Sequence, residues 1–550
     1  MKTERLLLYF HTVRYLRLGQ IVYQLYYRLA RTRVIRQALA PVNELSQRSW
    51  RGPWVAPLVR PRSHLGKGVF EFLGERGQVV SAADWNTKEK SKLWLYHLHY
   101  LDDLNAVDAD IRAAQQTWLV QCWIDDNPPL SGNGWEPYTL SLRLVNLVKW
   151  CARQSQIPVH WLASMARQAQ ALAALEERHI MANHLFANGK ALVFIGAFLT
   201  GKPGSRWLKR GLNILDREVG EQFLADGGHF ELSPMYHSIL LWDLCDLVNL
   251  ADRSGVPELL ERVSSWRGVI ERGLAWLECM CHPDGDIAFF NDAAFSSAPS
   301  LKEIKAYANC LGCSFAEQRR QPLSYVHLVN TGYIAVQLAQ GGKALLDVAE
   351  VGPSYQPGHA HSDTLSFELS LFGRRVLVNS GISQYGEDIE RQRQRSTAAH
   401  NTAEINGKNS SEVWAGFRVA RRARPVAPKI WEADGRLLVR CAHDGYRRLP
   451  GAPVHQRQWA FSTDGLLIVD TLSGCFQNAM ARFYLHPAIQ IAGHQELCLP
   501  EGHKVRWSVT GGQVQIVPST WHPEFGVAVP NYCIEIPFDG TEVAINFSWE

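Results

Sequence analysis

Three histidines in the second half of the chain could transfer protons or bind a metal ion. His359 and His361 are two residues apart in the segment 358–363, and His400 follows some forty residues later. Side chains at positions i and i+2 of an extended chain point to the same side, so His359 and His361 can act together. Because imidazole serves as acid, base or metal ligand, the segment is a candidate for proton transfer or metal binding.

Two predicted helix starts carry further groups of this kind. Asn183 is followed by His184, and its position predicts the N-cap of the next helix. Ser233 and Pro234 are typical of an N-cap and a first helical residue, which places Tyr236 in the first turn. Helix N-termini favour anions and ease ionisation of a nearby tyrosine. Each feature alone is typical of a cap or a core residue, and their combination favours a functional site.

The elements that must position these residues divide the chain into two parts. From about residue 90 to 310, apolar residues recur at helical spacing, with short connections and no strands between them, which predicts an all-α layer of helical hairpins. After Pro322, many short Val-, Ile- and Leu-rich runs separated by glycine turns predict an antiparallel β-sandwich. We expect an N-terminal arm at 1–85, a helical domain at 86–315 and a β-domain at 316–550.

Composition narrows the class of protein. With 550 residues, 46% hydrophobic and 20% charged, the chain is typical of a globular protein with more than one core. A net charge of +4 does not favour a nucleic-acid partner, and eleven cysteines in so long a chain do not indicate a disulfide framework. No apolar stretch approaches the ~20 residues of a membrane span, and we expect a cytoplasmic protein without a signal peptide. The sequence does not indicate an oligomeric state.

The first ~35 residues are rich in arginine and tyrosine, which leaves two interpretations open. They can pack on the body of the protein, or they can dock weakly on a membrane surface.

Five motifs occur in order along the chain. They are N-H-L-x-A-N-x-K (183–190), D-G-G-H-F-E-x-S-P-M-Y-H (226–237), H-P-D-G-x-I-A-x-F-N-D (282–292), G-H-A-H-S-D (358–363) and R-S-T-A-A-H-N-T (395–402). Together they resemble the heparinase II/III family of polysaccharide lyases. The resemblance implies an incomplete (α/α) toroid followed by an antiparallel β-sandwich, with the active cleft between them. It also implies β-elimination at a uronic acid, in which a proton leaves C5 and the 4-linked oxygen departs.

The resemblance assigns roles to four residues. Asn183, helped by His184, matches the group that neutralises the substrate carboxylate, without which C5–H is too weak an acid. Tyr236 and His359 match the catalytic tyrosine and histidine. In a syn elimination Tyr236 can be both base and acid; for the opposite stereochemistry His359 is the base and Tyr236 the acid.

Further residues are candidates for contact with an anionic polysaccharide. Aromatic side chains can stack on sugar faces, although tryptophans are often core residues, and arginines can clamp carboxylates or sulfates. The basic runs at 391–395 and 418–424 can equally form salt bridges or solvated faces. The residues that we expect to contact substrate are Trp135, His229, Arg395, Trp414 and Arg418.

Family members often hold a structural zinc ion in the β-domain, and the matching positions here are His361, Asn379 and His400. Asn379 departs from the family pattern, because an amide oxygen is a weaker zinc ligand than a carboxylate. Asp363 is close enough in sequence to replace it. The alternative is a metal-free cluster of hydrogen bonds, and we expect no organic cofactor.

The sequence thus favours a lyase that acts on a uronate-containing glycan. A non-catalytic glycan-binding or polysaccharide-assembly protein on the same fold is the main alternative. A glycoside hydrolase is a third hypothesis, which would require two carboxylates facing each other across the cleft; Glu231 and Asp292 are available for it.

Overall fold

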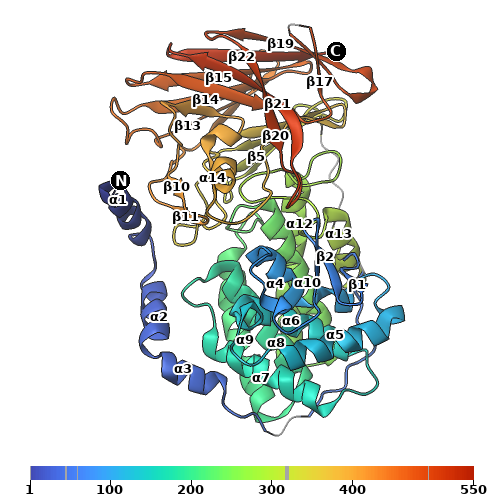
Figure 1. Cartoon of the computed structure of the whole chain (residues 1–550). Helices are drawn as coiled ribbons and strands as arrows, with labels where there is room; N and C mark the ends of the chain where they lie inside the picture. Colours follow the sequence, from blue (N-terminus) through green and yellow to red (C-terminus); the bar gives the residue numbers. More distant parts are fainter. Residues whose placement is uncertain (1, 44–45, 58–59, 316–320, 494) are drawn as a thin grey trace.

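The computed structural model describes residues 2–43, 46–57, 60–315, 321–493 and 495–550. Helices occupy the first part of the chain and strands the second, and the two parts are stacked end to end (Figure 1). The predicted fold class, an incomplete (α/α) toroid followed by an antiparallel β-sandwich, is confirmed. The predicted start of the sandwich at residue 316 lies outside the described residues, between a last helix that ends at Cys310 and a first strand that begins at Tyr325.

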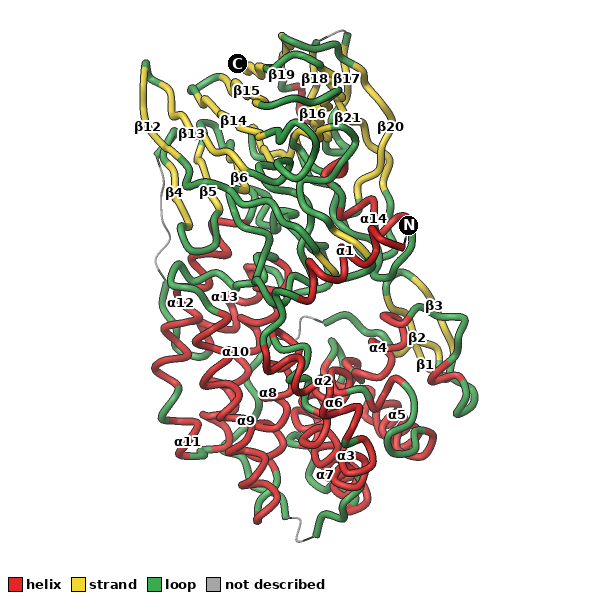
Figure 2. Tube along the Cα trace, turned by 90° about the vertical axis from the view of Figure 1, so that its left-hand side faces the viewer, coloured by secondary structure: helices red, strands yellow, loops and turns green. Residues whose placement is uncertain are grey.

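An N-terminal arm runs along the outside of both parts (Figures 1 and 2). It consists of α1 (Lys2–Val13), α2 (Leu18–Leu29) and α3 (Arg31–Ala38). Helix α1 contacts the sandwich and α3 contacts helix α7 of the toroid. A small antiparallel sheet, β1 (His64–Gly66), β2 (Val69–Phe72) and β3 (Glu75–Gln78), follows the arm and packs beside α4.

Consecutive helices of the toroid pack as hairpins around one hydrophobic core. The tightest hairpin joins α8 and α9, where a Cβ atom at Gly196 would lie 2.5 Å from the backbone nitrogen of Leu208. Glycine is therefore required for this close approach. The toroid helices are α4 (Lys92–Tyr100), α5 (Ala113–Asp126), α6 (Pro137–Cys151), α7 (Val159–Leu175), α8 (Ala182–Phe198), α9 (Gly201–Gln222), α10 (Pro234–Ser254), α11 (Pro257–Leu260), α12 (Val263–Met280) and α13 (Leu301–Cys310).

Buried charges link three of these helices. The Nζ atoms of Lys149 on α6 and Lys190 on α8 both lie 2.6 Å from Oδ2 of Asp246 on α10. Burial would raise the pKa of Asp246, but the two ammonium groups hold it below its ordinary value. A buried charge without its partner would lower the stability of the fold. The cluster therefore favours one arrangement of the three helices.

In the described part of the sandwich, three antiparallel sheets and a short hairpin pack around a second core. Along β15 buried and partly exposed residues alternate, as expected for a strand with one face toward the core. The strands of the eight-stranded sheet, in spatial order, are β12 (Lys429–Ala433), β13 (Arg436–His443), β14 (Val454–Phe461), β15 (Gly465–Ser473), β22 (Glu542–Trp549), β19 (Lys504–Thr510), β18 (Glu496–Cys498) and β17 (Gln490–Ala492).

The remaining strands form smaller units beside this sheet. The four-stranded sheet has the order β20 (Gln515–Trp521), β21 (Val529–Phe538), β16 (Ala479–Tyr484) and β9 (Ala403–Ile405). The five-stranded sheet has the order β4 (Tyr325–Leu328), β5 (Tyr333–Gln337), β6 (Lys343–Asp347), β7 (Phe367–Leu371) and β8 (Arg374–Leu377). The hairpin pairs β10 (Val413–Trp414) with β11 (Arg418–Val419), and helix α14 (Ile389–Arg395) precedes it.

One helix start differs from the prediction. Helix α8 begins at Ala182, so Asn183 lies in its first turn, and the prediction that Asn183 is the N-cap is wrong. Met181 and Ala182 both have positive φ, 69° and 53°. This conformation is unfavourable for residues with a side chain, and it turns the chain sharply just before Asn183. The other predicted cap is confirmed, because the side chain of Ser233 accepts a hydrogen bond from the backbone N–H of Tyr236.

Candidate active site at the junction of the two domains

Three residues that are far apart in sequence meet where the toroid contacts the sandwich. Asn183 lies in the first turn of α8, Tyr236 in the first turn of α10, and His359 in the loop between β6 and β7. Asn183 Nδ2 lies 3.4 Å from His359 Nε2. The rings of Tyr236 and His359 stack with their centroids 3.8 Å apart. An amide, a phenol and an imidazole are therefore in mutual reach, and two of them stand at helix N-termini, which favour anions.

Asp292 orients the histidine. Its Oδ2 lies 2.9 Å from His359 Nδ1, and its Oδ1 lies 2.8 Å from His361 Nε2. Arg391 donates a hydrogen bond to each of the two oxygens. Burial would raise the pKa of Asp292, but Arg391 and the two histidines hold it well below its ordinary range. The ionised carboxylate accepts the proton of His359 Nδ1, so Nε2 is the nitrogen available for proton exchange.

His359 Nε2 also faces a second carboxylate. Glu231 Oε2 lies 3.5 Å away, and Glu231 accepts hydrogen bonds from the backbone N–H and the amide of Asn183. Glu231 thereby fixes the Asn183 side chain at the start of α8. The His359 ring thus lies between two carboxylates, Asp292 at Nδ1 and Glu231 at Nε2.

Tyr236 is held as a protonated phenol. Its hydroxyl lies 3.0 Å from the hydroxyl of Tyr385, which comes from the loop between β8 and α14. Burial and the neighbouring Tyr385 raise the pKa of Tyr236 well above its ordinary value. At neutral pH the phenol therefore carries a proton that it can donate.

His184 adds positive charge beside Asn183. Its Nδ1 lies 2.9 Å from Glu177 Oε1, and its side chain remains 29% exposed. Burial would lower the pKa of His184, but Glu177 outweighs this effect and the pKa is raised. The ring also packs against Tyr138, at 4.5 Å between centroids. The site thus offers an imidazolium close to the start of α8.

The two carboxylates named for a hydrolase have other partners. Glu231 is 2% exposed and bonded to Asn183, whereas Asp292 is fully buried and bonded to Arg391 and two histidines. A glycoside hydrolase needs one carboxyl group as an acid and a second as base or nucleophile at the sugar. Both groups here serve as acceptors for protein donors, so the geometry does not favour hydrolysis.

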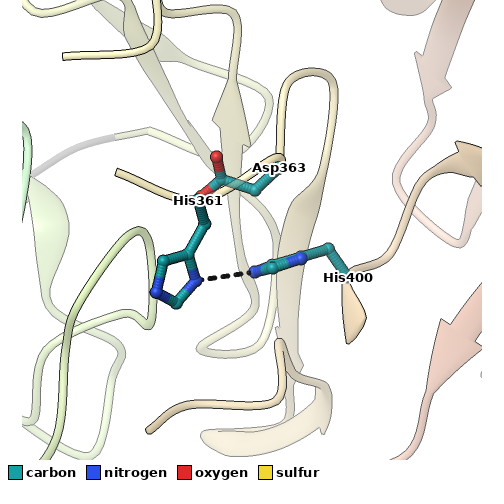
Figure 3. A group of neighbouring side chains, drawn as sticks. All are labelled: His361, Asp363 and His400. Atoms are coloured by element: carbon teal, nitrogen blue, oxygen red, sulfur yellow. Dashed lines mark hydrogen bonds between the residues drawn. The ribbon is translucent and has the colours of Figure 1, made fainter. Parts of the chain in front are cut away.

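A second cluster lies behind the first and could hold a metal ion. His361, Asp363 and His400 each place one potential ligand atom within 4.8 Å of the others (Figure 3). His361 Nε2 bonds to ionised Asp292, and His400 Nδ1 lies 2.7 Å from the carbonyl oxygen of Ser396. Both of these nitrogens must therefore carry hydrogen, which leaves lone pairs on His361 Nδ1 and His400 Nε2.

These two lone-pair nitrogens lie 3.1 Å apart. Two acceptors at this distance require a shared proton or a cation. Burial lowers the pKa of His361 and lowers that of His400 to about 4, which disfavours the proton. Two imidazoles with their other N–H groups bonded to oxygen, together with a carboxylate, form a donor set that suits zinc.

Asn379 takes a different position from the one expected. Its amide oxygen accepts the backbone N–H of Asn401, and its amide nitrogen donates to the carbonyl of Phe289. The side chain therefore ties three segments of backbone together. Of the two residues considered as third ligand, Asp363 is the one that joins the two histidines.

Three of the five expected substrate contacts are buried. Trp135 packs on Trp123 in the toroid core, and His229 is fully buried with its Nε2 bonded to Gln222. Arg395 is fully buried and donates to backbone carbonyl groups, including that of Ala360 beside His359. The three side chains are enclosed by other parts of the protein and present no face to a sugar.

The other two lie against the arm. Trp414 Nε1 donates to Thr12, and Arg418 lies over the rings of Tyr9 and Trp414. Three further arginines of the basic runs form ion pairs inside the protein: Arg391 with Asp292, Arg393 with Glu390, and Arg421 with Glu412. The interpretation as salt bridges thus holds for these three arginines, whereas Arg395 bonds to backbone carbonyl groups and Arg418 lies over aromatic rings.

Sequence reasoning missed two members of the site. Tyr385 is 149 residues from Tyr236 and belongs to none of the five motifs. Glu177 precedes the first motif, and its place six residues before Asn183 was the only available signal. Asp292 and Glu231 belong to motifs but were considered only as hydrolase carboxylates.

The fold and the site thus define a toroid–sandwich protein with an amide–phenol–imidazole cluster at the domain junction. Residues 107–317 match the profile described as heparinase II/III N-terminus, and residues 320–550 match the heparinase II/III-like C-terminal profile. The chain belongs to the heparinase II/III family.

Relatives with known activity share part of their length with this chain. A heparin-sulfate lyase of Bacteroides stercoris is 25% identical over 336 residues, which are 57% of this chain and 47% of that protein. A heparin-sulfate lyase of Pedobacter heparinus is 26% identical over 387 residues, 63% of this chain and 56% of that protein. The chain therefore spans about half the length of these relatives. A crystal structure of heparinase III shares the fold, with a TM-score of 0.67 at 17% identity, over 84% of this chain and 79% of that one.

Proposed function

We propose that this protein cleaves a uronate-containing polysaccharide by β-elimination. The observation that carries the proposal is the contact of Asn183 and Tyr236, from the toroid, with His359, from the sandwich. The similarity to heparin-sulfate lyases supports an anionic polysaccharide as the substrate class.

The first requirement of the reaction is a neutralised carboxylate. The C5–H bond of a uronate becomes acidic only when negative charge on the adjacent carboxylate is stabilised in the transition state. The amide of Asn183, whose position Glu231 fixes, can donate to this carboxylate. The His184 imidazolium and the N-terminus of α8 add positive charge on the same side.

Proton transfer then involves the other two residues. His359 Nε2 takes the C5 proton, and the electrons of the C–H bond form the C4–C5 double bond. The bond between C4 and the glycosidic oxygen breaks, and the departing oxygen takes the proton of Tyr236. The raised pKa of Tyr236 and the position of His359 between Asp292 and Glu231 support this division of roles.

We also propose that His361, His400 and Asp363 hold a structural zinc ion. Such an ion would neutralise the cluster and tie the loop that carries His359 to the segment around His400. His361 is bonded to the same Asp292 as His359. In this proposal the residues of the cluster position His359, and the chemistry stays with Asn183, Tyr236 and His359.

The test is a panel of uronate polysaccharides that differ in C5 configuration and sulfation, read by the ultraviolet absorbance of the unsaturated product. We expect Tyr236→Phe to lower kcat by roughly 10²–10⁴-fold, the contribution typical of general acid–base catalysis, with binding retained. Tyr446→Phe is a matched control, because Tyr446 is a buried tyrosine of the sandwich bonded to the carbonyl of Ala403.

Each other outcome rejects part of the proposal. Binding without absorbance on every substrate supports a non-catalytic glycan-binding protein, and new reducing ends without absorbance indicate hydrolysis. If His359→Gln keeps full turnover on one C5 epimer, Tyr236 serves as both base and acid there, and the role given to His359 is wrong.

A further inference from the structure

The N-terminal arm leaves an apolar face uncovered. On α2 the apolar residues recur at positions i, i+4, i+7 and i+11, and all of them are at least half exposed. Helix α1 repeats the pattern at i, i+4 and i+7. We call these residues the arm stripe: Leu6, Phe10, Val13, Leu18, Val22, Leu25 and Leu29. Because four residues make about one helical turn, the stripe follows one side of each helix.

The opposite side of the arm is fastened to the body of the protein. Gln20, the buried residue of α2, donates to the carbonyl groups of Ile180 and Tyr355. Tyr27 donates to the carbonyl of Glu176, and Arg17 pairs with Glu221 at 2.5 Å. The arm is therefore bound to the body of the protein through its polar side, and the arm stripe faces outward.

The charge of the arm indicates what covers the stripe. Between Glu4 and Glu44 the sequence contains seven arginines and no acidic residue. Three of these arginines, Arg28, Arg31 and Arg33, lie at the junction of α2 and α3 and are exposed. Tyrosine side chains at 23, 26 and 27 flank the stripe. An apolar face bordered by arginine and tyrosine is typical of helices that lie in a membrane interface.

Two other occupants fit less well. A second copy of the chain would bring the exposed arginines Arg28, Arg31 and Arg33 against the same three residues, and like charges at an interface oppose association. Within the described ranges, no helix is long and apolar enough to cross a bilayer. The arm satisfies the requirements for binding parallel to a surface instead.

We propose that the arm docks the protein on an anionic phospholipid surface, with the arm stripe in the interface and the arginines on the lipid headgroups. The surface lies close to the candidate active site. Helix α1 contacts the β10–β11 hairpin through Thr12 and Trp414, and carbonyl groups of that hairpin accept hydrogen bonds from Arg391 and Arg395. Docking would hold the site-bearing side of the protein near the membrane.

The experiment is flotation of the full chain with vesicles of phosphatidylcholine, with and without phosphatidylglycerol. The stripe variant combines Val22→Gln, Leu25→Gln and Leu29→Gln, and the charge variant combines Arg28→Gln, Arg31→Gln and Arg33→Gln. The control variant changes three exposed apolar residues outside the arm, Ile111→Gln, Val159→Gln and Val329→Gln, each of them more than half exposed. All changed residues are exposed, so the unfolding temperature should stay constant and is measured for each variant.

We expect the wild type to float with anionic vesicles and to be released by salt. The stripe variant should lower partitioning at least about tenfold, from the apolar area that it removes. The charge variant should lower it by roughly a hundredfold at low salt, at about 1 kcal/mol per arginine. The control variant should bind as the wild type does.

Two results would overturn the proposal. One is flotation that is no greater with anionic than with neutral vesicles, or that the stripe variant leaves unchanged. The other is a stripe variant that changes only the sedimentation coefficient, because this would show that a second copy covers the stripe. Neither result depends on lyase activity, so the docking proposal and the proposed function can fail separately.

Discussion

Two buried clusters in this protein are each built on an aspartate that is bonded to an arginine and to histidine, and they differ in what surrounds them. In the first, Asp292 accepts hydrogen bonds from Arg391 and from two histidines, His359 and His361. In the second, within the eight-stranded sheet, Asp470 accepts hydrogen bonds from Arg457 and His455. Each cluster continues to one more histidine, His400 in the first and His443 in the second.

Every histidine nitrogen of the Asp470 cluster has a partner of the right kind. The backbone N–H of Gly445 donates to His443 Nδ1, His443 Nε2 lies 3.2 Å from His455 Nδ1, and His455 Nε2 lies 2.7 Å from Asp470. With both rings neutral, each group donates to the next along the series Gly445, His443, His455 and Asp470. Burial lowers the pKa of both histidines, which agrees with neutral rings. Because each histidine nitrogen of the Asp470 cluster is paired inside the protein, we infer that the cluster has a structural role.

The Asp292 cluster has two open ends. His359 retains 11% side-chain exposure and faces Asn183 and Tyr236 of the toroid. At the other end the lone pairs of His361 and His400 face each other beside Asp363. An Asp–Arg–His group is therefore a candidate site only where one of its histidines faces another domain or lacks a hydrogen-bond donor.

The sharpest test of this difference is to remove the negative charge of the aspartate from each cluster. Asp292→Asn removes the charge that orients His359, and we expect kcat to fall roughly 10²–10⁴-fold. Asp470→Asn should lower kcat far less, because its cluster bonds to none of the reacting side chains and reaches the neighbouring segments only through Arg457, which donates to the carbonyl groups of Leu365 and Asn401. Both variants leave a buried arginine without its partner, so both should lose about 3–5 kcal/mol of stability. Steady-state kinetics and thermal unfolding measure the two effects.

If both substitutions lowered kcat equally, with equal losses of stability, the proposed role of Asp292 would reduce to support of the fold.

The two clusters should also differ in whether they bind zinc. A tightly bound cation that is absent from the unfolded chain stabilises by about 4 kcal/mol at a thousandfold excess over its Kd. We therefore expect a chelator to lower the unfolding temperature of the wild type, and His400→Gln to abolish both the effect and the bound zinc. His443→Gln should retain the zinc. Elemental analysis and calorimetry provide the measurements.

Equal metal content in the two histidine variants, or a wild type that never binds zinc, would favour the metal-free interpretation of the His361–His400 contact.

The smallest expected effect is a pH dependence at the open end near Asn183. The pKa of His184 is raised above its ordinary value of 6.5. Its positive charge is therefore fully present below that value and is lost as pH rises through the raised pKa. We expect KM for an anionic substrate to increase several-fold as pH rises through the raised pKa, and His184→Gln to have a high KM that varies less with pH. Kinetics at several pH values and constant ionic strength measure the slope; an equal slope in the variant would place the titrating group elsewhere.

Much of the local structure could be predicted from the sequence, because its signals lie within a few residues. Ser233 and Pro234 predicted the start of α10, and the Val-, Ile- and Leu-rich runs predicted as strands after Pro322 include β5 (Tyr333–Gln337). The start of α8 was misplaced because Met181 and Ala182 adopt positive φ, for which their residue types give no signal.

The five ordered motifs were sufficient to recognise the family and to select Asn183, Tyr236 and His359, since residue types and spacing are written in the chain. Whether a given side chain is available was settled by folding. Arg395 and His229 look like ligand-binding residues in the sequence, but distant backbone and side-chain partners bury them. Tyr385 and Asp292 join the site because loops separated by some hundred residues are packed together. Burial and the direction of hydrogen bonds depend on which segments touch, and a sequence pattern does not contain that information.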